Sequence, residues 1–289
     1  MTDQPAPAPP TPPRDDARPA RGPRVGAVVG LVVLAIVVAA GVVGVGISRG
    51  LPTSVPSPTG DAVVDAPHHG GPVEAGDGYA VWERNEDGAP IRWDPCSDVE
   101  VVVNPEGAPS GAAADLERAL AEVAAHTGLS LRVVDDTDER PAADRAAYQP
   151  ERYGQRWAPV LVAWAEPHEN GVSLRDIDRG LAVPVAVGEP GQRVYVTGQV
   201  VLNAHRDDLR PGFEDRADSW GATLLHELAH LVGLAHVDDP TELMAIHPGA
   251  GPVAFGPGDR AGLAAVGAAH GCLDVPQPRP VEVAPPPER

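Results

Sequence analysis

The chain has 289 residues, of which 43% are hydrophobic and 4% aromatic, and its formal net charge is −19. The length allows one or two domains, and the hydrophobic share suffices for a core built largely from Val, Leu and Ala. So negative a charge argues against nucleic-acid binding, because no basic surface is available to displace counterions from phosphates.

The amino-terminal part predicts a membrane anchor. Residues 1–24 are rich in Pro and Ala and should form a disordered cytoplasmic segment. Residues 25–47 carry no charge, and this run is long enough for a transmembrane helix across ~30 Å of hydrocarbon. Arginines are concentrated before this span, a bias that keeps the amino terminus in the cytoplasm and exports the rest. Arg14, Arg18, Arg21 and Arg24 precede it, and Arg49 follows it closely.

A cleaved signal peptide is the alternative interpretation of the apolar span, and it would make the protein secreted. Signal peptides normally have a shorter apolar region, of about 7–15 residues, followed by small residues placed for cleavage. In both cases the larger, carboxy-terminal part is expected to be extracellular.

The composition divides the remaining chain into three parts. Residues 48–76 contain much Pro, Gly and Ser and are predicted to be a flexible linker. Residues 77–274 have the size of one domain and are predicted to form the folded part of the chain. Residues 275–289 form a Pro-rich tail that is expected to be disordered, since it has too little apolar surface to offset its chain entropy.

Within the domain, the hydrophobic patterns predict a strand, a long helix, further strands and then two more helices. Aliphatic and β-branched runs indicate strands of one sheet at 99–103, 131–134, 160–165 and 194–202. Apolar residues at helical spacing indicate helices at 112–126, at about 219–231 and at 259–269. Ser110 is the expected cap at the start of the first helix, and Gly128 is expected to end it.

Three histidines and a glutamate form the main chemical motif of the sequence. His226 and His230 are one helical turn apart, so that both imidazoles can point at one ion. Gly233 can adopt a positive φ and turn the chain, which lets His236 reach the same ion. Three neutral imidazoles leave one position of a zinc ion open, as in catalytic rather than structural sites.

Glu227 lies beside the first histidine and is expected to act as general base. Zinc lowers the pKa of a bound water to ~7, and a carboxylate beside it can take the proton and pass it to a leaving amine. The implied reaction is amide hydrolysis. The alternative is an amphipathic helix whose histidines face the core or solvent without binding a metal.

The stretch HELAHLVGLAH resembles the long zinc-binding signature of the metzincin metallopeptidases. Met244, eight residues after His236, resembles the methionine of their Met-turn in the matrixin branch. IRWDPC, GQVVLN and GPGDRAGLAAVGAAHGC are similar, more loosely, to bacterial membrane-anchored or secreted matrixin-like peptidases.

The resemblance implies an α+β fold in a single catalytic domain. A twisted mixed β-sheet would lie over two long helices, an active-site helix and a backing helix, and a cleft would separate it from a smaller carboxy-terminal part. Met244 would lie beneath the metal. Substrate would bind as an extended strand along the edge of the sheet, at the segment ending at Leu202.

The sequence departs from the matrixin pattern at several points. Val237 stands where a serine is usual, and the Tyr-Pro after the turn methionine is missing, which puts the specificity loop in doubt. No cysteine-switch propeptide is present in the sequence. His168 and His205 could imitate the histidines of a structural zinc site, but their neighbours do not match, and a loop position is the alternative.

Two acidic stretches, 135–139 and 207–218, could offer oxygen ligands to Ca²⁺ as a second metal. Neither has the spacing of an EF-hand, and a solvated surface is the alternative. Cys96 and Cys272 lie near the two ends of the predicted domain, and an exported chain meets oxidising conditions, so a disulfide between them is expected. Alternatively, Cys96 could be an inhibitory zinc thiolate.

Together these patterns predict a membrane-anchored, extracellular zinc endopeptidase that acts on peptide or protein substrates. The zinc ligands would be His226, His230 and His236, with Glu227 as the catalytic base. Two other functions stay open: a zinc hydrolase of cell-wall or small amide substrates, and a non-catalytic surface module that contains zinc. An intact Glu227 speaks against the second, because a pure ligand site does not need that carboxylate.

Overall fold

The computed structural model describes residues 78–213, 218–246 and 253–281. The predicted cytoplasmic segment, transmembrane helix and linker, residues 1–76, lie outside this described part. Among the described residues, no helix is both long enough and apolar enough to cross a membrane.

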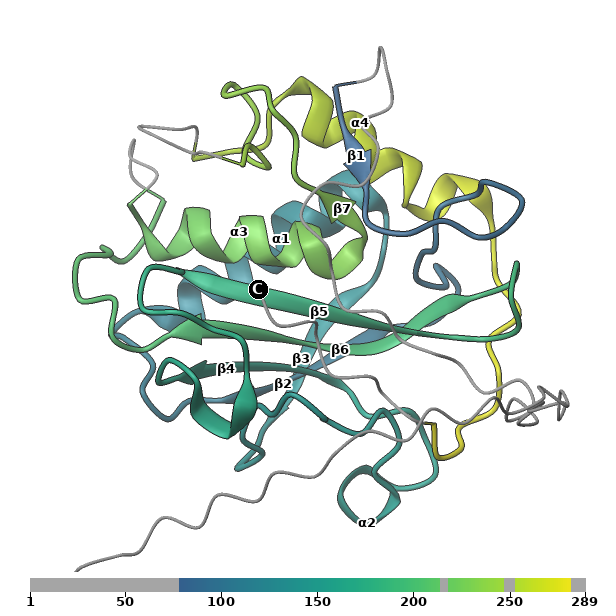
Figure 1. Cartoon of the computed structure of the whole chain (residues 1–289), viewed down its shortest axis with the longest axis horizontal. Helices are drawn as coiled ribbons and strands as arrows, with labels where there is room; N and C mark the ends of the chain where they lie inside the picture. Colours follow the sequence, from purple (N-terminus) through teal and green to yellow (C-terminus); the bar gives the residue numbers. More distant parts are fainter. Residues whose placement is uncertain (1–77, 214–217, 247–252, 282–289) are drawn as a thin grey trace, which may run out of the picture. The chain divides into compact units, whose positions relative to one another are not determined.

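Five strands form the main sheet, in the order β3-β2-β4-β6-β5 (Figure 1). The first four strands of that order run parallel, and β5 is antiparallel to β6. A mixed sheet is what the sequence analysis expected. The strands are β2 (Val99–Asn104), β3 (Leu131–Asp136), β4 (Val160–Ala165), β5 (Gly180–Val187) and β6 (Val194–Asn203).

Strand β5 corrects the predicted position of the sheet edge. The segment ending at Leu202 belongs to β6, which pairs with β4 on one side and β5 on the other and therefore cannot be the edge. The edge strand next to β6 is β5, which was not predicted from the sequence. Pro184 lies in its middle, and a proline argues against a strand unless that strand lies at an edge, where one missing N–H is tolerated.

Helices α1 (Ala112–Thr127) and α3 (Trp220–Val232) lie side by side, with α3 running alongside β5 (Figure 1). The predicted cap of α1 is wrong: Gly111 precedes the helix in a left-handed conformation, and no side chain caps it. Gly128 ends α1 as predicted, with φ 72°, and donates its N–H to the carbonyl of Ala124.

The predicted third helix is shorter than expected. Helix α4 spans Pro257–Ala265, and a separate 3-10 turn, η2, spans Ala268–His270. Gly267 separates the two, and a Cβ atom there would lie 2.2 Å from the carbonyl oxygen of Thr127, so only glycine fits this close approach.

Four short elements complete the described part. Strands β1 (Ala80–Val81) and β7 (Leu234–Ala235) form a separate antiparallel pair. Helix α2 spans Pro150–Tyr153 and the 3-10 turn η1 spans Glu169–Gly171.

The largest hydrophobic cluster fills the space between the two long helices and the sheet. Helix α1 contributes Leu116, Leu120 and Val123, and α3 contributes Leu224, Leu228 and Leu231. Burying a leucine of this kind stabilises the fold by about 1.5–3 kcal/mol. Helix α3 is buried along almost its whole length, so the residues that it presents to the functional site are held on a rigid element.

A disulfide between Cys96 and Cys272 ties the carboxy-terminal segment to the start of the domain. Neighbouring hydrogen bonds support the same connection, because Asp94 accepts from the backbone N–H of Leu273 and Arg92 donates to the carbonyl of Gly271. Residues 275–281, the described part of the predicted tail, form no helix or strand. They nevertheless contact the domain, where Trp157 donates to the carbonyl of Pro276.

Candidate metal centre

Helix α3 carries the first two histidines and has clear local signals at both ends. The Ser219 side chain caps its start by accepting the N–H of Ala222 at 3.2 Å. Gly233 ends it with φ 116°, a conformation that favours glycine, and its N–H donates to the carbonyls of Ala229 and His230. The chain then turns into β7, so that His236 returns towards the helix.

The three histidine side chains converge on one point through the same ring nitrogen. The distance between the Nε2 atoms is 3.0 Å for His226 and His236, 3.1 Å for His226 and His230, and 3.2 Å for His230 and His236. A tetrahedral ion with zinc–nitrogen distances of about 2.0–2.1 Å would hold its ligand nitrogens about 3.3–3.4 Å apart. The spacing of the three nitrogens therefore fits a single ion of this kind.

Two of the rings are fixed by backbone carbonyls on their other nitrogen. The Nδ1 atom of His226 donates to the carbonyl of Leu243 at 2.9 Å, and that of His230 donates to the carbonyl of Leu234 at 2.8 Å. Because a carbonyl only accepts, Nδ1 carries the proton in both rings and Nε2 keeps a lone pair. Lone pairs that face one another at about 3 Å repel, and a cation between them removes that repulsion.

The surroundings of His226 also favour the neutral form of its ring. Burial lowers the pKa of His226, the Leu243 carbonyl raises it, and the positive charge of Arg179 lowers it further. Neutral imidazole is the form that binds a metal. The Trp82 ring lies edge-on to the His230 ring, with centroids 5.0 Å apart, and supports it from the side of β1. Nothing in the histidine motif indicates a role for Trp82, which precedes it by more than a hundred residues.

Glu227 is buried, with 6% of its surface exposed, and lies against the first residue of β5. A Cβ atom built on Gly180 would be 3.0 Å from Cγ and 3.2 Å from Cδ of Glu227. The carboxyl group therefore lies between the histidine-bearing helix and the edge strand. Absence of a side chain at position 180 is what allows this approach.

The segment after His236 folds into a closed turn that contains Met244. The N–H of Val237 donates to the carbonyl of Met244 at 2.9 Å, and the N–H of Ile246 donates to the carbonyl of Val237 at 2.9 Å. Met244 is buried, with 1% of its surface exposed. The turn contacts the histidine cluster through Leu243, whose carbonyl fixes His226.

Within the described residues, one other group brings three possible metal ligands together: Asp94, Cys96 and Cys272. Its two cysteines are joined by the disulfide, so neither is a thiolate that could bind a metal ion or block the metal site by binding to zinc. His168 and His205 are exposed and are not part of either group. The His205 ring pairs with Glu166 instead.

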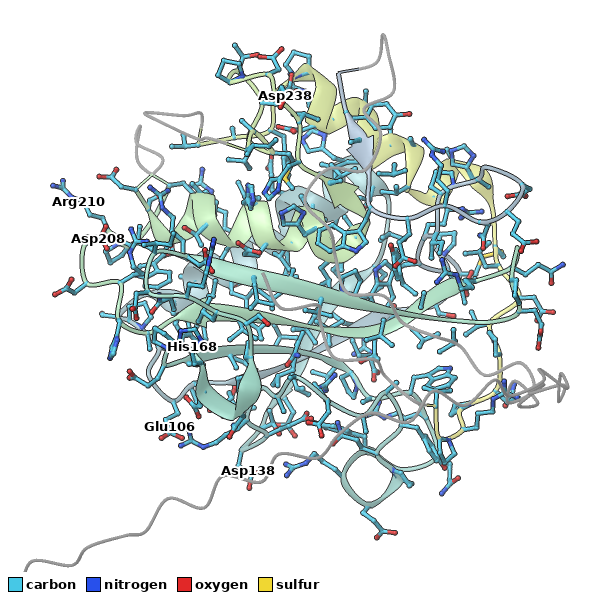
Figure 2. All side chains as sticks on the ribbon, viewed as in Figure 1. Glu106, Asp138, His168, Asp208, Arg210 and Asp238 are labelled. Atoms are coloured by element: carbon cyan, nitrogen blue, oxygen red, sulfur yellow. A yellow bond between two sulfur atoms is a disulfide. The ribbon has the colours of Figure 1, made fainter. Side chains whose placement is uncertain are left out.

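Three carboxylates of the two acidic stretches proposed for Ca²⁺ pair with arginines. Glu139 accepts two hydrogen bonds from Arg145, each 2.9 Å long, and Asp138 pairs with Arg152. Asp208 accepts two hydrogen bonds from Arg206, each 2.7 Å long. Figure 2 shows Asp138 and Asp208 at the periphery of the molecule, pointing outward. Residues 214–217 of the second stretch lie outside the description.

Comparisons with known proteins add little to this geometry. No protein-family model matches the chain, and no curated protein matches it. Among solved structures, metalloproteinase-II from Bacteroides fragilis aligns with 16% sequence identity and a TM-score of 0.30. The alignment covers 59% of this chain and 52% of that chain, about half of its length. At that level of similarity, the histidine cluster itself is what indicates a function.

Proposed function

We propose that this chain is a zinc-dependent endopeptidase of the matrixin-like metzincin kind, anchored in a membrane with its catalytic domain outside the cell. The observation that carries the proposal is the convergence of three Nε2 atoms within 3.0–3.2 Å of one another beside the buried carboxylate of Glu227. A ligand set without a catalytic carboxylate would fit a structural zinc site equally well, and Glu227 distinguishes the two.

The residues of the site divide the chemistry between them. Zinc, held by His226, His230 and His236, would supply Lewis acidity that acidifies a water molecule and polarises a peptide carbonyl. Glu227 takes a proton from the attacking water and delivers it to the nitrogen of the leaving amine. Burial between α3 and β5 restricts the carboxylate to one place, which keeps it oriented for both transfers.

Strand β5 offers a binding surface for an extended peptide. It pairs with β6 along one side, and no described strand pairs with its other side. A substrate chain could add there as a further strand, with main-chain hydrogen bonds for affinity. Because β5 begins at Gly180, next to Glu227, a peptide on this edge would pass the catalytic carboxylate.

The turn that contains Met244 supports the matrixin-like character of the site. It is closed by hydrogen bonds to Val237, the residue after the third histidine, and its methionine is buried. We place Met244 beneath the metal by resemblance to the Met-turn. Val237 and the residues after Met244 differ from the matrixin pattern, so side-chain preference at the cleavage site should differ as well.

The membrane anchor is proposed from residues 25–47, which no described element includes. If it is correct, the full chain should fractionate with membranes, and a chain that starts at residue 50 should be soluble. Membrane association of the shortened chain would contradict the anchor.

The function is tested by purifying residues 50–289, measuring bound zinc and incubating the protein with a random peptide library. One zinc per chain and new peptide termini detected by mass spectrometry are expected. Bound zinc without any cleavage would contradict an endopeptidase. Cleavage confined to small amides or cell-wall peptides would instead support the alternative function, a zinc hydrolase of those substrates.

A further inference from the structure

A buried carboxylate on α4 holds the turn that follows the third histidine. Asp259 accepts the N–H of Leu243 at 2.6 Å, that of Gly256 at 2.9 Å and that of Met244 at 3.3 Å. Only 1% of its surface is exposed. Asp259 therefore fixes two successive peptide groups of the turn from the outside.

A second buried carboxylate makes the reverse connection. Glu242, in the turn, accepts the N–H of Gly258 at 2.9 Å and that of Asp259 at 2.8 Å. These amides belong to the first turn of α4, where N–H groups have no partner within the helix. Each segment thus supplies the carboxylate that satisfies the backbone of the other.

Two glycines, Gly256 and Gly258, leave room for the Glu242 carboxylate against the start of α4. A Cβ atom on Gly256 would lie 2.3 Å from a carboxylate oxygen of Glu242. One on Gly258 would lie 3.1 Å from Cδ of Glu242 and 2.1 Å from the carbonyl oxygen of Gly78. Larger residues at 256 and 258 would push the carboxylate away from the helix.

The pair connects directly to the histidine cluster. Leu243 donates its N–H to Asp259, and its carbonyl accepts the Nδ1 proton of His226. The Leu243 carbonyl shares its peptide plane with the N–H of Met244, which also donates to Asp259. Asp259 thus holds the plane of the acceptor that orients the ring and selects the tautomer with its lone pair on Nε2. Two negative groups kept so close inside the protein are costly, since burial and then the charge of Glu242 act to raise the pKa of Asp259.

We propose that Glu242 and Asp259 are positioning residues for the metal site: they form a reciprocal clasp that sets the Leu243 carbonyl and, through it, the tautomer and orientation of His226. This inference rests on the proposed function for its role in zinc binding, but the effect on His226 itself does not require zinc.

The effect on His226 can be measured in the full-length, metal-free protein. Nitrogen-15 NMR correlations of the imidazole rings at pH 7.5 report which ring nitrogen carries the proton. The parent should show His226 protonated on Nδ1, whereas Glu242→Gln and Asp259→Asn should show a mixture of both tautomers. Glu242→Gln has the shape of the parent side chain and keeps one acceptor oxygen, so it decides the test if Asp259→Asn does not fold.

Two control variants separate positioning from a loss of charge or of stability. Asp239→Asn removes a carboxylate from the same turn, where it accepts from Thr241 and not from Leu243 or Met244. Glu139→Gln breaks the buried pair with Arg145 and should lower stability without reaching the histidines. Both should keep the parent tautomer of His226.

A zinc titration of the same proteins adds the functional measurement. The clasp variants should bind zinc about tenfold more weakly than the parent, the lower end of the range for groups that orient metal ligands, while the controls should match the parent. Absence of zinc binding in the parent would contradict the proposed function and leave the NMR test intact. Clasp variants that fold and keep both the parent tautomer and the parent zinc affinity would overturn the inference.

Discussion

A Cβ atom placed on Gly180 would lie 3.0 Å from Cγ of Glu227, closer than side chains normally approach one another. The same Cβ atom would lie 3.1 Å from Cδ2 of Leu202, so it could not move away from Glu227 without crowding Leu202. The edge strand and the proposed catalytic base are therefore in direct contact. This contact places the Glu227 carboxylate, the proposed base, beside the strand along which substrate is expected to bind.

Substituting Gly180→Ala should displace Glu227 while leaving the histidines in place. We expect kcat/KM to fall by about 10- to 100-fold, because proton transfer depends on the exact position of the Glu227 carboxylate. The amount of bound zinc should stay unchanged. Steady-state kinetics on one cleaved peptide, together with metal analysis, checks this. Ile177→Ala, an exposed position three residues earlier, is the control and should keep the parent rate. Equal rates for all three proteins would show that the contact has no catalytic consequence.

Each of the three clustered histidines should be necessary for zinc binding, and the exposed ones should not. His226→Ala, His230→Ala and His236→Ala each remove one of three ligands, so zinc should be lost on dialysis against a weak chelator. His168→Ala and His205→Ala are matched controls, because both rings are exposed and outside the cluster. Loss of zinc from a control variant would reveal a second metal site.

Asp259 should make the protein less stable as pH rises from about 4 to 6. Burial is the largest cause that raises its pKa, from the ordinary value of 3.8 to about 6 in the folded protein. Between these values the folded state holds a proton that the unfolded state has released, so the stabilisation present below pH 4 is lost as pH passes 6. The loss is on the order of 3 kcal/mol.

Urea unfolding at several pH values measures this contribution as the difference between the parent and Asp259→Asn. The parent should lose stability relative to the variant over that range of pH. A constant difference would mean that Asp259 titrates near its ordinary pKa and that its backbone hydrogen bonds compensate its burial.

Removing the disulfide should lower stability without affecting the site. Cys96 and Cys272 are 176 residues apart in sequence, for which the chain-entropy treatment gives a stabilisation of about 5 kcal/mol. Hydrogen bonds of Asp94 and Arg92 to the same carboxy-terminal segment should retain it after reduction. Cys96→Ser with Cys272→Ser should thus show a lower Tm and parent zinc content. Zinc loss in this double variant would indicate that the ends of the domain support the metal centre.

Local signals allowed much of this structure to be predicted from the sequence. Strand 160–165 and the ends of α1 and α3 at Gly128 and Gly233 follow from hydrophobic runs and from glycines that accept positive φ. The grouping of His226 with His230 follows from helical spacing alone. The return of His236 required the turn at Gly233, which the sequence also indicated.

The features that could not be predicted from the sequence depend on contacts between distant segments. Strand β5 contains Pro184, and only its place at the edge of the sheet, which no local pattern specifies, makes that residue acceptable. Asp259 and Glu242 are of residue types that usually lie on the surface. They are buried because two segments distant in the sequence meet in the folded chain. Trp82 reaches His230 because β1 pairs with β7. None of these relationships has a signature within a short window of sequence.

The most direct measurement compares the parent with Glu227→Gln, both loaded with zinc, on a peptide that the parent cleaves. Because the amide cannot accept the proton of water, kcat should fall by about 10²- to 10⁴-fold, while bound zinc remains at one per chain. Such a result would assign the base to Glu227 within an intact metal centre. Undiminished cleavage by the zinc-loaded variant would contradict the proposed role of Glu227 and, with it, the catalytic interpretation of the histidine cluster.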